Sequence, residues 1–385
     1  MKKIFSVILI CLSVFPLGIV RASELKLAEN AKSAILLEPT TGEIIFEKNS
    51  HEKLHPASMT KMMSMLLVVE AIEKGVINWD DIVTVSENAA SMGGSQILLE
   101  VGEQMSVDDL FKGVAVASGN DAVVALAEKI GGSEAIFVDM MNDRAKELGL
   151  TDTNFKNPHG LDEANHYSSA YDMAMIAKEL VKHPKVLEYT SIYEDYLRQN
   201  TDRKIWLVNT NKLVRFYTGV DGLKTGYTSS AGYCLTATAK KNNSRFIAVV
   251  MGEADSKTRN KEISEMLDYA FAQYEVETML STNSVVATKE IEKGKQKYAE
   301  IVPLYEVTFL NKKGTNKQNA SYEIETDLLK APIKHGDIVG NLVIKQDNEV
   351  IRTVPVTVKI DIEKANILEL YWRHLTDIFK GDVNL

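Results

Sequence analysis

Ser58 and Lys61 lie one helical turn apart at the start of an apolar segment that is expected to form a helix. A serine hydroxyl becomes a nucleophile when a base takes its proton. Lysine serves as that base if burial or a second positive charge lowers its pKa from about 10.4. The same spacing occurs at 23–26 and 50–53, but only the pair at Ser58 opens an apolar helix. Taken alone, the pair also fits an N-cap serine followed by a solvated lysine.

Two further motifs supply polar groups that such a nucleophile needs. Residues 118–120, Ser-Gly-Asn, lie between expected helical segments and offer a hydroxyl and a carboxamide, although the same pattern recurs at 86–88 and 281–283. Residues 224–226, Lys-Thr-Gly, occur once, just before an expected strand. They offer a cation, a hydroxyl and a small residue that lets a substrate approach. Each motif alone is typical of a loop, so the interpretation depends on all three occurring together and in this order.

One pattern indicates different chemistry. His51 and His55, with Glu52 between them, match the zinc-protease spacing H-E-x-x-H, and Glu73 follows as a candidate third ligand. The two histidines would have to share a helix face, yet the residue before Pro56 avoids the helical region. The surrounding residues are mostly polar, which is typical of a surface connection. We therefore expect no metal at this site.

The elements around these motifs are those of an α+β domain. A strand, a turn and a second strand are expected within 34–46, and mostly helical segments within 56–190. Strands return at 232–239 and 246–251, and a helix follows at 261–274. The sheet is thus assembled from strands that precede and follow a helical insertion.

The character of the chain changes at about residue 276. Residues 276–362 contain short β-rich runs separated by polar turns, which predicts a second, all-β domain. Residues 363–385 are expected to form an amphipathic helix whose apolar face contains Ile367, Leu368, Tyr371, Trp372, Leu375, Ile378 and Phe379. Such a face either lies in a membrane surface or docks on the β domain, and we favour the membrane.

The start of the chain and its charge limit where the protein works. Residues 1–22 combine two lysines with an apolar run and end on small residues, which predicts an export signal cleaved after Ala22 rather than an uncleaved anchor. Cys234 is then the only cysteine, so no internal disulfide forms, and it is expected to pack in the core. The net charge of −9, from 44 basic and 53 acidic residues, argues against nucleic-acid binding but leaves a local basic patch open.

Together and in order, the three motifs resemble those of the penicillin-binding proteins and class A β-lactamases. Residues 30 to about 275 are similar to the low-molecular-mass penicillin-binding proteins, the serine D-alanyl-D-alanine carboxypeptidases of peptidase family S11. Further likenesses lie at 56–58, 157–161, 219–224 and Arg259.

The resemblance implies a fold and an activity. Residues 23–275 would form a β-lactamase/transpeptidase-like catalytic domain, in which an antiparallel sheet is combined with helices and an all-helical subregion. The β domain would be the family's second domain, and the tail helix would attach the exported protein peripherally to the cell membrane. The enzyme would need no cofactor, act on the peptidoglycan pentapeptide and be acylated by β-lactam antibiotics. Within the family, the chain most resembles the sporulation-associated carboxypeptidases of spore-forming bacteria.

The family's catalytic roles transfer residue by residue. Ser58 would be the nucleophile that attacks the carbonyl between the two terminal D-alanines. Lys61, kept neutral by the nearby Lys224, would take its proton. Ser118 would relay a proton to the leaving amine, and Asn120 would hold the peptide backbone of the substrate.

The resemblance assigns the family's substrate-binding roles to the third motif, at 224–226, and to residues that follow it in the sequence. The backbone N–H groups of the nucleophile and of Tyr227 would form the oxyanion hole. Lys224, Thr225 and Arg259 would grip the terminal carboxylate beside Gly226, which makes the enzyme a carboxypeptidase rather than an endopeptidase. Arg259 is also explained as a solvated charge before the following helix. Some relatives carry histidine at Tyr227, so no side-chain role is transferred to it.

Two rival functions keep the same motifs. A serine β-lactamase is disfavoured because no Glu-x-x-Leu-Asn segment lies between Asn120 and Lys224, and because such enzymes lack a second β domain and a tail helix. A non-catalytic module that binds muropeptides would keep the fold without the chemistry. Changing Ser58 to alanine separates the alternatives, because binding would survive the change and acylation would not.

Overall fold

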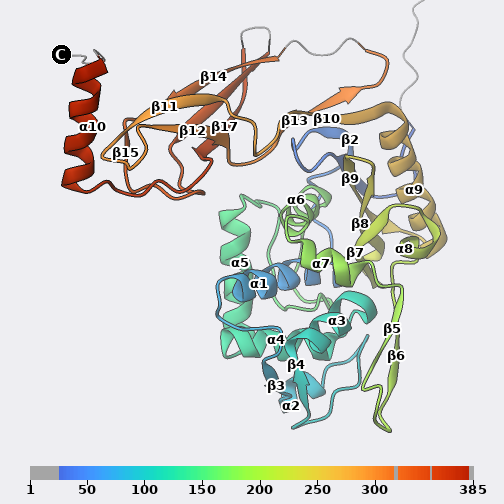
Figure 1. Cartoon of the computed structure of the whole chain (residues 1–385). Coiled ribbons are helices and arrows are strands. Elements are labelled where there is room, and N and C mark those ends of the chain that lie inside the picture. The colour runs from blue at the N-terminus through green and yellow to red at the C-terminus, as the bar shows by residue number, and fades with distance from the viewer. Residues whose placement is uncertain (1–25, 316–319, 347–348, 381–385) are drawn as a thin grey trace, which may run out of the picture.

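The computed structural model describes residues 26–315, 320–346 and 349–380. The predicted export signal at 1–22 therefore lies outside the described residues. Figure 1 shows a helix-rich part with a central sheet, an elongated β part that extends to one side of it, and the C-terminal helix α10 at the far end.

The first part is built on an antiparallel sheet with the strand order β2-β1-β9-β8-β7. As predicted, its strands precede and follow the helical insertion. They are β1 (Ser33–Leu37), β2 (Ile44–Lys48), β7 (Val220–Thr228), β8 (Gly232–Lys241) and β9 (Ser244–Glu253). One prediction was wrong. Residues 224–226 lie within β7 rather than before a strand, because their backbone pairs with β8 along its length.

The segment between β2 and β7 is mainly helical, as expected. It contains η1 (Ala57–Thr60), α1 (Lys61–Glu73), α2 (Glu87–Ala90), α3 (Val107–Ala117), α4 (Asn120–Gly131), α5 (Glu134–Glu147), α6 (Ala170–Leu180), α7 (Pro184–Thr190) and α8 (Leu213–Phe216). Two short strand pairs complete it: β3 (Ile82–Thr84) with β4 (Gln104–Ser106), and β5 (Glu194–Leu197) with β6 (Ile205–Val208). Ser106 and Ser133 are the N-caps of α3 and α5, since each side chain accepts a backbone N–H bond in the first turn.

Helix α9 (Ser256–Gln273) begins earlier than the predicted start at 261. Its N-cap is Asp255, whose carboxylate accepts the backbone N–H groups of Lys257 and Thr258 at 2.8 Å. Arg259 therefore lies inside the helix and is only 5% exposed, so its interpretation as a solvated charge before the helix was wrong.

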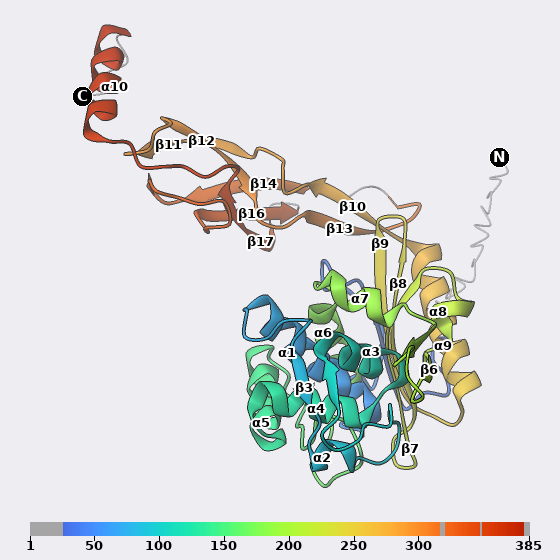
Figure 2. The same ribbon diagram turned by 60° about the horizontal axis from the view of Figure 1, so that its bottom comes forward.

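The sheet has a hydrophobic core on each face, because successive side chains of a strand point to opposite sides. Ile35 and Leu37 of β1 pack with the helices of the insertion, whereas Leu36 packs with α9 residues such as Ile263 and Met266 on the other face. Figure 2 shows α9 on one side of the sheet and the insertion on the other. Cys234 is fully buried, as predicted.

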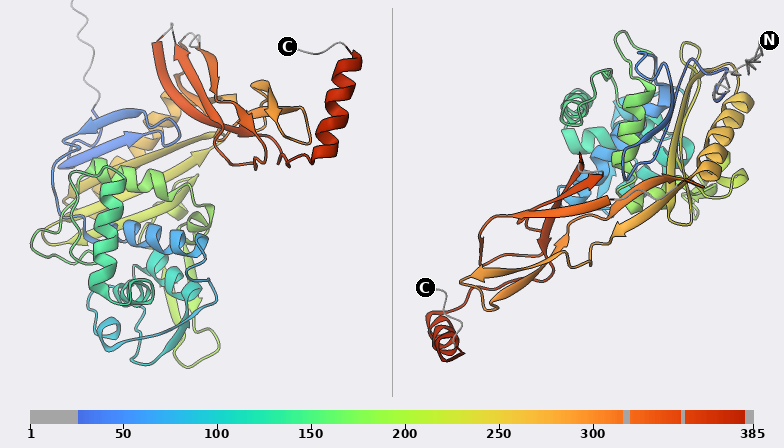
Figure 3. Two further views of the ribbon diagram at one scale, coloured as in Figure 1. Left: turned by 90° about the vertical axis from the view of Figure 1, so that its left-hand side faces the viewer. Right: turned by 90° about the horizontal axis from the view of Figure 1, so that it is seen from above.

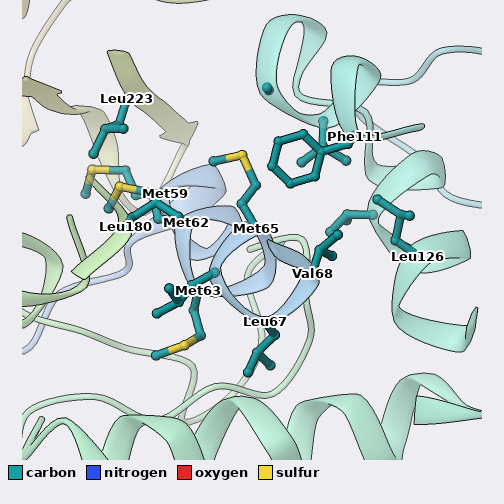
Figure 4. Packing of buried hydrophobic residues seen from close by; sticks show 14 of the residues in the cluster. Met59, Met62, Met63, Met65, Leu67, Val68, Phe111, Leu126, Leu180 and Leu223 are labelled. Carbon is teal, nitrogen blue, oxygen red and sulfur yellow. The ribbon is translucent and has the colours of Figure 1, made fainter. Parts of the chain in front are cut away.

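Helix α1 is buried on all sides, which sets the position of the reactive turn at its start. Met62, Met63 and Met65 are at most 1% exposed and contact residues of α3, α4, α6 and β7 (Figure 4). A helix that is apolar all round is stable only in such surroundings. The first turn of α1 is consequently held from several elements at once.

The second part is all β. Strands β10 (Tyr274–Leu280) and β13 (Val307–Lys312) pair with each other. A separate sheet has the order β14-β16-β17-β12-β11-β15, from β11 (Ala287–Glu292), β12 (Tyr298–Pro303), β14 (Ala320–Thr326), β15 (Leu329–Lys330), β16 (Gly340–Gln346) and β17 (Glu349–Val358). Its own core includes Ile301, Leu342 and Val356.

Helix α10 (Ile367–Lys380) lies at the end of the β part farthest from the first part (Figure 3). Arg373 on its polar face donates to backbone carbonyls of Gly294 and Lys295. Trp372 and Phe379 of the apolar face remain 65% and 87% exposed. The apolar face is thus not docked on the described β strands. No helix in the described part of the chain is long and apolar enough to cross a membrane.

Candidate active site

The turn that carries Ser58 is a single 3-10 turn, η1, which begins after Pro56 and leads directly into α1. Ala57 has a positive φ of 47°. The carbonyl of Ala57 lies against Gly160, where an added Cβ would be 1.9 Å from that oxygen. Only glycine therefore lets the 157–161 loop approach the turn of Ser58.

The Lys61 side chain joins three elements. Its Nζ lies 3.0 Å from Ser58 Oγ, 2.6 Å from Asn120 Oδ1 and 2.7 Å from the backbone oxygen of His159. The last two groups accept hydrogen bonds but cannot donate them. A neutral amine that donates its two protons to these carbonyls directs its lone pair at the Ser58 hydroxyl. An ammonium would also find three acceptors here, so the protonation state decides whether Lys61 acts as a base.

The surroundings of Lys61 also favour the neutral amine. The side chain is fully buried, and burial is the main cause that brings its pKa well below the usual lysine value. The charge of Lys224 lowers the pKa further, and Asp121 opposes the shift. Burial, followed by the charge of Arg259, lowers the pKa of Lys224 to about 7.

The 118–120 motif connects α3 to α4. Ser118 ends α3 in the left-handed conformation, with φ 65°. Its hydroxyl is buried and has no hydrogen-bond partner among the described residues. Asn120 is fixed at both ends of its carboxamide, since Nδ2 donates to Gly93 O at 2.7 Å while Oδ1 accepts from Lys61. The Ser118 side chain is therefore the one of this motif that has no hydrogen-bond partner among the described residues.

Strand β7 forms the opposite wall. Lys224 is 1% exposed and Thr225 is 7% exposed, and Thr225 Oγ1 donates to Thr210 Oγ1 at 2.8 Å. A Cβ at Gly226 would lie 2.7 Å from Pro56 O. The absence of a side chain at Gly226 is thus what brings β7 against the Ser58 turn.

The outer edge of the site carries Tyr227 and Arg259. Tyr227 is 54% exposed and its ring lies 4.3 Å from that of Tyr233, at 33° between the planes. The Arg259 guanidinium donates to Asn260 Oδ1 at 3.1 and 2.9 Å and has no carboxylate partner among the described residues. A buried arginine without a carboxylate is a favourable place for an anionic ligand.

A cavity of about 480 Å³ joins these groups. Six of the nine predicted site residues line it: Ser58, Ser118, Thr225, Gly226, Tyr227 and Arg259. The other three, Lys61, Asn120 and Lys224, are buried just behind this lining. The three motifs, which are far apart in the sequence, thus meet at one site.

Comparison with known proteins identifies the family. Residues 20–255 match the family model of D-alanyl-D-alanine carboxypeptidase, Peptidase S11. The chain belongs to this family. Residues 274–364 match the C-terminal domain of penicillin-binding protein 5, which accounts for the β part. The chain is accordingly a serine-type D-alanyl-D-alanine carboxypeptidase, and the comparisons give no support to the β-lactamase alternative.

The relatives cover almost the whole chain. D-alanyl-D-alanine carboxypeptidase DacF of Bacillus subtilis is 54% identical over 93% of this chain and 92% of its own length. DacA of Haemophilus influenzae is 36% identical over 91% and 90%. Among solved structures, penicillin-binding protein 5 from H. influenzae has a TM-score of 0.71 at 34% identity and covers 89% of this chain and 99% of its own.

The zinc alternative does not bring its ligands together in this carboxypeptidase. His51 Nδ1 lies 2.8 Å from Asp152 Oδ2, whereas Glu73 pairs with His183 at 2.8 Å. His51 and His55 lie in a connection without helical structure. Within the described ranges, no group of three or more His, Cys, Asp or Glu side chains is placed to hold a metal.

Sequence reasoning missed several supporting residues of the carboxypeptidase site. The His159 carbonyl binds Lys61, but no sequence pattern predicts a backbone acceptor. Thr210, between Asn209 and Asn211, bonds to Thr225. The Asn-Thr-Asn run was a usable signal, because asparagine side chains often satisfy backbone groups in loops.

Changing Gly226 to alanine is expected to lower the rate of acylation about 100-fold, with a smaller effect on folding. The new Cβ would meet the Pro56 carbonyl at 2.7 Å and displace β7 from the Ser58 turn, and a misplacement of about 1 Å costs about this much in rate. The rate at which the benzylpenicillin adduct forms measures the rate of acylation. Gly93→Ala is the control, because its Cβ would meet nothing within 4 Å. Equal acylation rates for both variants would contradict the prediction.

Proposed function

We propose that this carboxypeptidase removes the terminal D-alanine of peptidoglycan stem peptides through an acyl-enzyme on Ser58. The observation that supports this most strongly is the placement of Lys61. Its Nζ lies 3.0 Å from Ser58 Oγ and its other two contacts are hydrogen-bond acceptors. Burial and the Lys224 charge both favour the neutral amine, as a base requires.

In the first step, Ser58 Oγ attacks the carbonyl carbon between the two D-alanines while its proton moves to Lys61. The developing oxyanion is held by the backbone N–H groups of Ser58 and Tyr227, and each such donor contributes about 10²–10³ in rate. Collapse of the tetrahedral intermediate breaks the peptide bond. The leaving amine takes a proton through Ser118, whose buried hydroxyl has no partner among the described residues.

In the second step, water attacks the acyl-serine ester and Lys61 again accepts the proton. The C–O bond to Ser58 breaks, Ser58 Oγ takes the proton from Lys61, and the shortened peptide leaves with a new carboxylate. Asn120 keeps Lys61 in place through Oδ1, and the second N–H of its Nδ2 is left for the substrate backbone.

The terminal carboxylate of the substrate is held by Lys224, Thr225 and Arg259. The Arg259 guanidinium has no carboxylate partner among the described residues, and Thr225 lines the same cavity. A bound carboxylate favours the charged form of Lys224, whose pKa without substrate is lowered to about 7. Substrate binding thus restores the positive charge that keeps Lys61 neutral.

The direct test is D-alanine release from a pentapeptide, together with the intact mass of the protein after brief exposure to benzylpenicillin. We expect D-alanine release and a stable adduct of one drug molecule, since the solved penicillin-binding protein D2 of Listeria monocytogenes, 31% identical over 64% of this chain and 99% of its own at a TM-score of 0.58, is in its cefotaxime-bound form. Rapid hydrolysis of the drug without an adduct would favour a β-lactamase. If the protein neither releases D-alanine nor reacts with the drug, a muropeptide-binding module would be the remaining function.

We further propose that the protein works outside the cytoplasm, after cleavage of residues 1–22. The remaining chain divides into a catalytic domain at 23–275, a β domain at 276–362 and a tail at 363–385. The separate hydrophobic core of the β part supports this division. A sporulation-associated role stays a prediction from the resemblance alone.

The tail helix is proposed to attach the protein peripherally to the membrane. Its apolar face is exposed, and its polar face is tied to the β domain through Arg373. This arrangement presents Trp372 and Phe379 outward, as an interfacial helix requires.

Changing Trp372 and Phe379 together to serine is expected to lower binding to phospholipid vesicles about 10²- to 10⁴-fold. Each large apolar side chain contributes about 1.5–3 kcal/mol when it leaves water. Vesicle co-sedimentation measures the effect, and Thr376→Ala on the opposite face is the control. D-alanine release from a soluble peptide should stay at the wild-type rate. Unchanged vesicle binding of the double variant would exclude the helix as the anchor.

A further inference from the structure

The cavity beside Ser58 has an unusual charge balance. Two charged residues line it, Lys212 and Arg259, and no described aspartate or glutamate does. Lys224 lies buried behind the same wall. The residues proposed above to hold the substrate carboxylate, here called the carboxylate grip, are Lys224, Thr225 and Arg259. Lys212 is not among them. A cavity with positive charge alone favours an anionic ligand and raises its local concentration.

The backbone at Lys212 is held rigidly. The Asn209 side chain donates to the carbonyls of Thr190 and Ile192 at 3.0 and 2.7 Å. Asn211 is fully buried and donates to the Gly222 carbonyl of β7 at 3.0 Å. Lys212 then becomes the N-cap residue of the short helix α8. Lys212 therefore lines the cavity from a fixed backbone position beside β7.

The Lys212 ammonium has no carboxylate partner among the described residues. Its Nζ lies 5.3 Å from the centre of the Tyr193 ring, a cation–π contact that leaves its hydrogen-bond donors unused. Thr210, two residues earlier, is bonded to Thr225 of the proposed carboxylate grip. The free ammonium and the grip thus belong to one wall of one cavity.

Arg215 provides a natural comparison. Its guanidinium carbon lies 4.8 Å from the centre of the same Tyr193 ring, yet Arg215 is exposed and does not line the cavity. The two residues share their charge, their ring partner and the α8 segment. They differ in that only Lys212 reaches the substrate cavity.

We infer that Lys212 is an additional substrate-binding residue, which donates to the terminal carboxylate of the peptide and makes the enzyme select substrates that end in a free carboxylate. This inference rests on the proposed function. A hydrogen bond between a charged donor and a carboxylate that is partly shielded from water is worth about a tenfold change in affinity. The effect is expected in KM, because Lys61 rather than Lys212 is hydrogen-bonded to Ser58, where bonds are made and broken.

The test uses two thioester analogues of the stem peptide, one with a leaving group that ends in a carboxylate and one with the methyl ester of that leaving group. Lys212→Met, Lys212→Arg and Arg215→Met are compared with the wild type. We expect Lys212→Met to raise KM for the carboxylate analogue about tenfold with kcat nearly unchanged, and to affect the ester much less. Lys212→Arg should restore most of the loss, and Arg215→Met should behave as the wild type on both analogues.

Several results would overturn the inference. An equal loss on both analogues would mean that Lys212 supports the wall of the cavity rather than the carboxylate. An equal loss in Arg215→Met would mean that the net surface charge alone attracts the substrate. Wild-type kinetics in Lys212→Met would exclude any binding role while leaving the proposed function intact. No turnover by the wild type of either analogue or of the pentapeptide would contradict the proposed function itself, and the inference with it.

Discussion

Ser58→Ala is expected to abolish the benzylpenicillin adduct and to lower D-alanine release by at least about 10⁴-fold. No acyl-enzyme forms without the hydroxyl, and the residual rate comes only from binding and oxyanion stabilisation. Ser58 is half-buried in η1, directly before α1, and its Oγ is hydrogen-bonded only to Lys61 among the described side chains. The fold should therefore tolerate the change. Intact mass spectrometry and a D-alanine assay measure the two effects.

Ser64→Ala is the matched control for this experiment. Ser64 is a buried serine of the same helix, and its Oγ donates to Pro158 O at 2.7 Å. Its loss should lower the free energy of unfolding by about 1–3 kcal/mol because the carbonyl is left unsatisfied. Acylation of Ser58 should persist in this variant. An adduct that forms on Ser58→Ala at the wild-type rate would exclude Ser58 as the nucleophile.

Lys61→Met is expected to lower the rate of acylation about 10²–10⁴-fold, the usual contribution of a general base. Methionine keeps much of the buried volume, but its thioether is not basic enough to accept the Ser58 proton. Stopped-flow acylation by a chromogenic cephalosporin gives the rate. The acylation rate of Lys61→Arg is the decisive comparison. The arginine side chain stays charged and cannot act as a base, so this variant should be as inactive as Lys61→Met. A near-normal rate in either variant would assign the base to another group.

The difference in stability between the wild type and Lys61→Met is expected to depend on pH. The pKa of Lys61 is lowered by folding, so below about 10.4 the unfolded chain binds a proton that the native state does not hold. Protonation of the unfolded state therefore destabilises the wild type as pH falls from that value. The Lys61→Met protein lacks this effect. We expect the wild type to gain stability relative to the variant as pH rises from 7 to about 10, measured by urea unfolding. A pH-independent difference would mean that Lys61 is charged in the folded enzyme.

Local sequence signals predicted much of the fold because they act over a few residues. Ser106 and Ser133 cap their helices through bonds to the next turn, and the strands around 34–46 and 232–251 follow from alternation and turn residues. The two misplaced boundaries had specific causes. The glycines of β7 weakened its strand signal, and the Asp255 cap of α9 was overlooked.

The sequence by itself determined which groups do the chemistry. Ser58 with Lys61 one turn later, the Ser118 motif and the Lys224 motif are local patterns, and their order along the chain was sufficient to indicate the family. Only the tertiary structure decided how these groups behave. The pKa of Lys61 depends on burial and on Lys224, and the acceptors that orient its lone pair come from residues 59 and 98 positions away.

The walls of the cavity were likewise decided only by the tertiary structure. The approach of β7 to Ser58 depends on the missing side chain of Gly226, and the separation of Lys212 from Arg215 depends on which of them faces the cavity. Charge, dielectric environment and close backbone contact are properties of residues brought together by folding. They are set by distances in space, and a linear pattern of residues does not contain those distances.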